Sequence, residues 1–197
     1  MLLSRAARGA SGESARRRLG LSGLALLVGL VAGLSLDRAF AKDERSSHVA
    51  LQRAEGGTTT LSKLAQDGGP IAVIVIKGAW CRTCVVQIAS LKEKIAEVQA
   101  TGGQVVVLSG DRRRENRQLQ RALRLPFPVL GDPHGDLLEP LGMYPDGARH
   151  PAPGLIFVDR CGSIDLVRPG RSPSVSQDQL ILGELERLAA SACGGVA

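Results

Sequence analysis

Three runs dominated by apolar, largely β-branched residues form the strongest pattern in the chain. They span residues 71–76, 104–109 and 155–158. A strand that is covered on both faces needs apolar side chains on both faces. These runs therefore predict the central strands of a sheet that is packed between two layers.

A helix is expected between the first two of these strands. Apolar residues recur there at one-faced helical spacing, at Val85, Ile88, Leu91, Ile95 and Val98. Two glycines, Gly102 and Gly103, end the pattern. Strand, helix and strand make a βαβ unit, so the strands at 71–76 and 104–109 are expected to be parallel with a right-handed crossover.

Shorter elements complete the expected domain. They are strands at 49–52, 58–60 and 164–167, the last as the hairpin partner of 155–158, and helices near 61–65 and 116–123. The last helix is expected to have a capping box of Ser176 and Gln179 and an apolar face of Leu180, Leu185, Leu188 and Ala192. This order predicts a single α/β domain whose central mixed sheet is flanked by helices on both faces.

The first 41 residues have the order of an export signal. Three arginines at 16–18 precede an apolar stretch, and Ala39-Phe40-Ala41 is a small-x-small cleavage triplet. Cleavage there would leave 42–197 as the mature domain, and the arginines also resemble a twin-arginine signal. The alternative is an uncleaved membrane anchor at 19–36, which at about 18 residues is near the lower limit for spanning a bilayer. Both predict a periplasmic domain.

Charge and aromatic content argue against nucleic-acid binding. Six arginines against two acids within residues 1–41 account for +4 of the net charge of +6. The domain that follows is nearly balanced, and the chain has only three Phe, one Trp and one Tyr. It therefore offers neither a basic stripe nor stacking aromatics to a nucleic acid.

Cys81 and Cys84 are the candidate catalytic residues. In a Cys-x-x-Cys at the start of a helix, the first sulfur lies near unpaired backbone N–H groups and the positive end of the helix dipole, which stabilise its thiolate. The second cysteine, one turn later, can attack the mixed disulfide and release the product. We therefore assign Cys81 as the nucleophile and Cys84 as the resolving thiol.

A metal site is a weaker interpretation of this pair. Structural zinc needs four ligands, and the sequence has no second Cys-x-x-Cys or His-x-His to complete the set. Cu(I) bound by two thiolates stays an alternative. We interpret His48, His134 and His150 as solvated loop residues and Met143 as a core residue. No metal or cofactor is expected.

The motifs around the pair carry a family resemblance. They are the Trp80-Cys81-x-x-Cys84 motif after an apolar strand, Leu-Pro-Phe-Pro-Val-Leu-Gly-Asp-Pro at 125–133, and Pro-Gly-Leu-Ile-Phe-Val-Asp-Arg-Cys-Gly at 153–162. Together they resemble the redoxin branch (peroxiredoxin-like, AhpC/TSA) of the thioredoxin superfamily, and the periplasmic thiol-disulfide oxidoreductases of the TlpA and ResA type. The resemblance covers about residues 47–190 and implies a thioredoxin-like fold. It also implies a cis-proline at Pro153 and a substrate groove bordered by Trp80 and Pro153.

The sequence also departs from these families. Val75 stands where cytoplasmic thioredoxins bury a carboxylate, and residues 77–80 hold no hydroxyl that could orient a peroxide for Cys81. Arg82 adds a positive charge beside Cys81, which favours the thiolate and predicts a more oxidising disulfide than that of thioredoxin.

The remaining cysteines, Cys161 and Cys193, are expected at the end of the domain opposite the redox pair. In a thioredoxin-like sheet, the turn after the proline-led strand and the end of the last helix both lie there, so we predict a structural Cys161–Cys193 disulfide. Two separate thiols, or Cys161 as a distant resolving cysteine for Cys81, are the alternatives.

These features predict an exported thiol-disulfide oxidoreductase that exchanges disulfides with protein cysteines and is reset by a membrane redox partner. A thiol peroxidase on the same scaffold and a non-enzymatic Cu(I)-binding assembly factor are the alternatives. The motif leaves open whether the pair oxidises or reduces its clients.

Overall fold

The computed structural model describes residues 46–170 and 177–193. The expected export segment and Ser176 of the expected capping box lie outside these residues. Among the helices that are described, none is both long enough and apolar enough to cross a bilayer.

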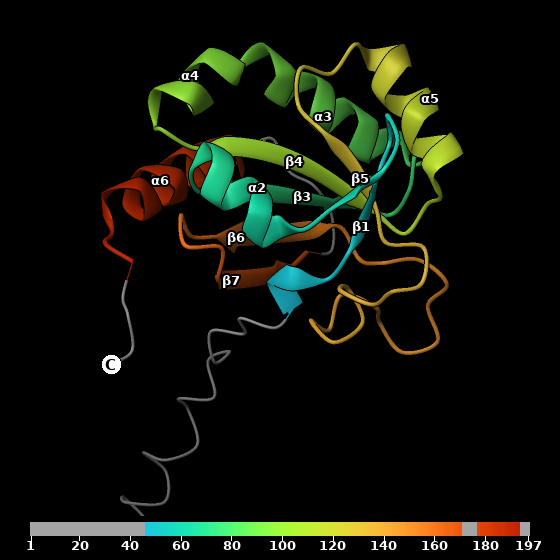
Figure 1. Cartoon of the computed structure of the whole chain (residues 1–197). Coiled ribbons are helices and arrows are strands. Elements are labelled where there is room, and N and C mark those ends of the chain that lie inside the picture. Colours follow the sequence, from blue (N-terminus) through green and yellow to red (C-terminus); the bar gives the residue numbers. More distant parts are fainter. Residues whose placement is uncertain (1–45, 171–176, 194–197) are drawn as a thin grey trace, which may run out of the picture. The chain divides into compact units, whose positions relative to one another are not determined.

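The described part of the chain forms one seven-stranded mixed sheet (Figure 1). Its strands are β1 (Leu51–Arg53), β2 (Thr58–Thr59), β3 (Ile71–Ile76), β4 (Gln104–Ser109), β5 (Val129–Gly131), β6 (Gly154–Val158) and β7 (Ile164–Pro169). They lie in the order β2-β1-β5-β4-β3-β6-β7. The pairs β3/β4 and β4/β5 are parallel, and the other pairs are antiparallel. The predicted mixed sheet is confirmed.

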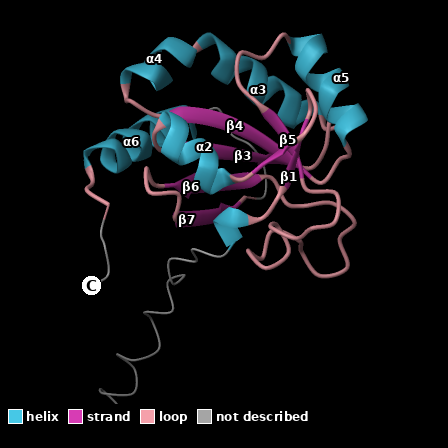
Figure 2. Cartoon of the chain, in the orientation of Figure 1, coloured by secondary structure: helices cyan, strands magenta, loops and turns pink. Residues whose placement is uncertain are grey.

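Helices cover both faces of this sheet. They are the 3-10 helix η1 (Ser46–His48) and the α-helices α2 (Leu61–Gly68), α3 (Arg82–Glu93), α4 (Ile95–Ala100), α5 (Arg113–Leu123) and α6 (Gln177–Ala190). Alternate residues of β3 point to two separate apolar clusters. Ile74 and Ile76 join the cluster that contains residues of α3 and α6, and Val73 and Val75 join the one that contains residues of α2. Figure 2 shows α3, α4 and α5 along one side of the sheet.

Two helices differ from the pattern expected from the sequence. The helix after the cysteine pair is broken at Lys94, whose Nζ lies 3.4 Å from a carboxylate oxygen of Asp178 at the start of α6. In α6 the buried apolar residues are Ile181, Leu185 and Leu188, whereas Leu180 is only partly buried. Ala192, also expected on the apolar face, is exposed and follows the end of the helix.

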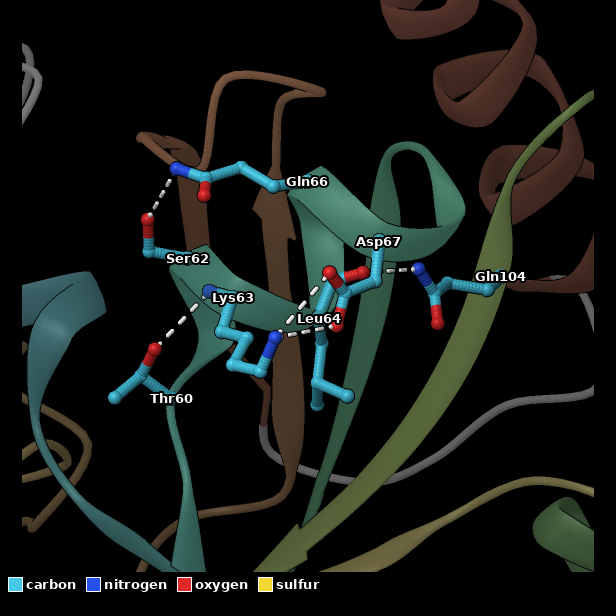
Figure 3. A network of polar contacts seen from close by, with 7 residues as sticks. All are labelled: Thr60, Ser62, Lys63, Leu64, Gln66, Asp67 and Gln104. Carbon is cyan, nitrogen blue, oxygen red and sulfur yellow. Dashed lines mark hydrogen bonds and ion pairs between the residues drawn. The ribbon is translucent and has the colours of Figure 1, made fainter.

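A polar network caps α2 and links it to the first residue of β4 (Figure 3). Thr60 caps α2, because its Oγ1 accepts a hydrogen bond of 3.0 Å from the backbone N of Lys63. Lys63 also forms an (i, i+4) ion pair with Asp67 at 3.0 Å. Gln104, the first residue of β4, donates from Nε2 to the carbonyl of Leu64 at 2.8 Å, which fastens α2 to the sheet.

The register between β3 and β6 places the four cysteines at two ends of the sheet. Val75 pairs with Gly154, so Pro153 lies at the end of the sheet where β3 leads to the Cys81–Cys84 pair. Ile71 pairs with Val158, so Cys161 follows β6 at the opposite end. Six strand residues separate the two ends, a distance of about 20 Å.

Candidate redox site

Cys81 and Cys84 form a disulfide at the start of α3. Cys81 is the N-cap residue, and its Sγ accepts a hydrogen bond of 3.3 Å from the backbone N of Cys84. This places the first sulfur at the positive end of the helix, where a thiolate is stabilised by unpaired N–H groups. Cys81 is partly exposed, whereas Cys84 is fully buried in the core. Cys81 is therefore the more accessible of the two cysteines.

A tight turn carries the chain from β3 to the cysteine pair. Gly78 has a φ of 156°, and its carbonyl accepts a hydrogen bond of 3.1 Å from the backbone N of Cys81. A Cβ at Gly78 would lie 2.6 Å from Nε1 of Trp80 and 2.9 Å from Oδ2 of Asp111. Glycine is required here because the indole and the carboxylate both approach the backbone closely.

Asp111 is a site residue that the sequence analysis missed. Its Oδ2 accepts a hydrogen bond of 2.7 Å from the backbone N of Ala79, inside the turn that leads to Cys81. The carboxyl ends of parallel strands lie at one edge of a sheet, and Asp111 follows β4 as Ala79 follows β3. The acid in Ser-Gly-Asp directly after a buried strand was the signal that could have identified it.

Two buried polar residues hold the loop that carries Asp111. Ser109 and Asn116 are fully buried, and the Ser109 hydroxyl donates to Oδ1 of Asn116 at 2.8 Å. Nδ2 of Asn116 then donates to the carbonyl of Asp111 at 3.1 Å. The backbone N of Asp111 donates to the Ser109 hydroxyl at 3.1 Å. The direction of the Asp111 carboxylate is thus supported by a satisfied polar network.

The position where thioredoxins bury a carboxylate is apolar in this protein. Val75 is only 1% exposed and belongs to the apolar cluster on the α2 side of the sheet. Asp111 supplies a carboxylate to the cysteine turn from the loop after β4 instead.

A groove of about 360 Å³ lies beside the redox pair. Both residues expected to border a substrate groove, Trp80 and Pro153, line it. Trp80 is 59% exposed, and its ring makes an edge contact with His150 at a centroid distance of 5.1 Å. The structure therefore brings together Trp80, from the cysteine turn, and the segment that precedes β6.

The cis peptide bond expected before Pro153 is not present in the structure. Among the described residues no peptide bond is cis, so Pro153 follows a trans bond. The segment is held in place by backbone hydrogen bonds, because the N of Ala152 donates to the carbonyl of Met143 at 2.6 Å and the carbonyl of Pro153 accepts from the N of Gly170 at 2.6 Å. The energies of cis and trans X-Pro bonds differ by only about 0.5 to 1 kcal/mol, so tertiary contacts decide between them.

Cys161 and Cys193 form the second disulfide, with Cα atoms 5.7 Å apart. Cys161 lies in the turn between β6 and β7, and Nε2 of Gln66 in α2 donates to its carbonyl at 3.5 Å. Cys193 follows the end of α6. The bond therefore joins the last helix to the end of the sheet opposite the redox pair.

The remaining candidate residues differ in exposure, and His48 lies in the 3-10 helix η1 and not in a loop as expected. Arg82 is exposed at the first position of α3. His48, His134 and His150 are exposed, and Met143 is fully buried in the core. Within the described ranges, no cluster of three or more His, Cys, Asp or Glu side chains is arranged to hold a metal ion.

Comparisons with known proteins place the chain in a family. The sequence profile of the AhpC/TSA family matches residues 43–167. No curated protein that was compared with the chain matches it.

Several solved structures share the fold. The peroxidoxin BcpB from Mycobacterium tuberculosis is 17% identical, with a TM-score of 0.63 over 71% of this chain and 92% of its own. Peroxiredoxin Q from Xanthomonas campestris is 13% identical, with a TM-score of 0.66 over 77% and 98%. A peroxiredoxin-like protein from Aquifex aeolicus is 14% identical, with a TM-score of 0.58 over 70% and 82%. The fold is thioredoxin-like, and because the family profile spans more than half of the sequence, the chain belongs to the AhpC/TSA family.

Proposed function

We propose that this protein is a thiol-disulfide oxidoreductase whose Cys81–Cys84 pair exchanges disulfides with the cysteines of other proteins. The observation that carries the proposal is the difference in exposure between the two cysteines. Cys81 is partly exposed at the N-cap of α3, and Cys84 is buried one turn later within bonding distance of it. A reachable nucleophile with a protected resolving thiol suits two-step exchange.

In the reducing direction, the Cys81 thiolate attacks one sulfur of a client disulfide and expels the other client sulfur as a thiolate. The Cys84 thiol then loses its proton and attacks the Cys81 sulfur. This forms the Cys81–Cys84 disulfide and releases the second client thiolate, so that two electrons pass from the pair to the client. In the oxidising direction the same steps run in reverse, starting from the disulfide that the structure holds.

Export completes the proposal. The signal-like residues 1–41 support a periplasmic location, either as a soluble domain after cleavage or as a domain anchored through residues 19–36. Disulfides persist in that compartment, where a membrane redox partner would return the pair to its starting state.

A thiol peroxidase is the second candidate, and membership of the AhpC/TSA family favours it. The Cys81 thiolate and one proton would convert a hydroperoxide to an alcohol, leaving Cys81 as a sulfenic acid. Cys84 would then condense with it, releasing water and forming the same disulfide. The absence of a hydroxyl in residues 77–80 argues against this route.

Trapping with single cysteine variants tests the proposal. Cys84→Ser should accumulate mixed disulfides between Cys81 and client proteins, because the resolving thiol is missing. Cys81→Ser should trap none, and Cys161→Ser with Cys193→Ser is the matched control that keeps the redox pair.

The same variants separate the two candidates. Peroxide consumption that survives Cys84→Ser in the presence of an external thiol, together with no trapped client, would establish the peroxidase instead. Equal trapping by Cys81→Ser would contradict the assignment of Cys81 as the nucleophile.

A further inference from the structure

The groove beside the redox pair is positively charged. Its lining includes Lys77, which directly follows β3, and Arg149 in the segment before β6. Among the residues that the structure describes, no aspartate or glutamate lines it. The only acid in residues 144–153 is Asp146, which is not among the lining residues. The nearby carboxylate of Asp111 is engaged with the backbone N of Ala79.

The cations in this groove are available to a ligand. Lys77 and Arg149 are both exposed. The ion pairs found among the described residues involve other side chains. Two full positive charges within one concave surface attract anions more strongly than the same charges on a flat surface, because the low-dielectric walls focus the field.

The rest of the lining suits a polypeptide. Pro145, Pro151 and Pro153 provide rigid apolar walls, and Trp80 provides an exposed aromatic ring beside Cys81. The volume of about 360 Å³ lies in the range of ligand clefts, which combine apolar walls with a few charged groups. An extended segment lying along Trp80 would bring its own cysteine next to Cys81, the residue that follows Trp80 in the chain.

We infer that the groove selects client proteins whose reactive cysteine lies within an acidic segment, with Lys77 and Arg149 binding the flanking carboxylates. This inference rests on the proposed exchange function and names its substrate class. The charges act on the approach of the client and on its position. Acidic clients should therefore exchange faster than other clients, and added salt should reduce this difference in rate.

Three dithiol peptides of one sequence, with Glu, Gln or Lys around the cysteines, test the inference. The fluorescence of Trp80, the only tryptophan, follows the reduction of the Cys81–Cys84 disulfide by each peptide. Each rate is divided by the rate of the same peptide with a small uncharged disulfide, which removes differences in thiol reactivity. At low ionic strength the Glu peptide should react about tenfold faster than the Lys peptide. This ratio should fall several-fold at about 1 M salt, where the Debye length is about 3 Å.

Charge-reversal variants connect the preference to the groove. Lys77→Glu with Arg149→Glu should reverse the order of the peptides, and Lys77→Gln with Arg149→Gln should abolish it even if the reversed variant does not fold. Arg114→Glu with Arg121→Glu makes the same change in net charge on exposed residues of α5, outside this groove, and should keep the preference.

Each outcome decides a separate point. Equal normalised rates for the three peptides, or a preference that survives in Lys77→Gln with Arg149→Gln, would overturn the inference and leave the exchange function standing. Reduced glutathione reacting faster than the Glu peptide would show that the groove takes a small acidic thiol, which also overturns it. No exchange with any peptide would overturn the proposed function, and the inference with it.

Discussion

The carboxylate of Asp111 accepts a hydrogen bond of 2.7 Å from the backbone N of Ala79, and Ala79 lies two residues before Cys81. This bond joins the loop after β4 to the turn after β3, which carries the candidate nucleophile. A hydrogen bond to an ionised acceptor is stronger than a neutral one. The position of Cys81 thus depends on a residue 30 positions further along the chain.

Replacement of Asp111 should disturb this turn. In Asp111→Ala the amide of Ala79 loses its acceptor, and we expect the free energy of unfolding to fall by about 1.5 kcal/mol. We also expect slower exchange through a lower turnover number with little change in KM, because the groove is kept. Urea unfolding and steady-state kinetics measure the two effects.

Asp111→Asn is the matched variant, because its side-chain oxygen can accept the same hydrogen bond. It should recover most of the lost stability and turnover. If Asn and Ala variants are equally slow while Asn restores stability, the charge of Asp111 is what matters, and the positioning role is wrong.

The disulfide between Cys161 and Cys193 should stabilise the fold without taking part in exchange. It closes a loop with a sequence separation of 32 residues. By restricting the unfolded chain, closure of such a loop stabilises the folded state by about 3 to 4 kcal/mol. Cys161→Ser with Cys193→Ser should lose this amount in urea unfolding and keep its exchange rate at temperatures where it stays folded. A folded double variant that no longer exchanges would contradict a purely structural bond.

Arg82 should raise the reduction potential of the pair by a small amount. Its positive charge at the start of α3 stabilises the Cys81 thiolate and so the reduced form. Arg82 is exposed, and an exposed charge contributes at most about 1 kcal/mol, which corresponds to about 20 mV for a two-electron couple. Arg82→Ala should therefore lower the potential by up to about 20 mV in equilibrium with a thiol buffer, and Arg82→Lys should not. An unchanged or higher potential in the alanine variant would refute this role.

Tyr144 should ionise at a higher pH than an ordinary tyrosine. Burial raises the pKa of its phenol above 10.0, and the nearby carboxylates of Asp132, Glu139 and Asp111 raise this pKa further. The associated stability is fully present below the pKa of the unfolded state and is lost as the pH rises through the higher folded value.

The phenolate absorbance reports this ionisation directly, because Tyr144 is the only tyrosine. Its midpoint should be higher in the native protein than in urea. Glu139→Gln should shift the native midpoint down, because one of the charges that raise the pKa of Tyr144 is removed. Equal native and denatured midpoints would show that the phenol is solvated.

The central strands were predictable because their signal is local. The bounds of β3 and β4 agree with the predicted runs, and β6 begins one residue earlier. Burial on both faces requires an unbroken apolar run, which can be recognised without knowledge of the neighbours. The start of α3 at the cysteine pair was likewise visible in the sequence, since helical spacing begins there.

Features that depend on partners were missed. Strand β5 has only three residues between a proline and a loop, and it exists because β4 and β1 pair with it. The break at Lys94 accompanies an ion pair with Asp178, which is distant in the sequence. The cis bond expected at Pro153 was wrong because backbone partners at Met143 and Gly170 hold that segment.

The sequence by itself identified the Cys81–Cys84 pair at the start of a helix, because the spacing of two cysteines on one helical turn is a local property. It also determined the thioredoxin-like order of elements, which apolar periodicity encodes. Only the tertiary structure decided what surrounds the pair. Asp111 accepts a hydrogen bond from Ala79 because the parallel strands β3 and β4 end at the same edge of the sheet. Lys77 shares a groove with Arg149 because the long segment before β6 returns to that edge.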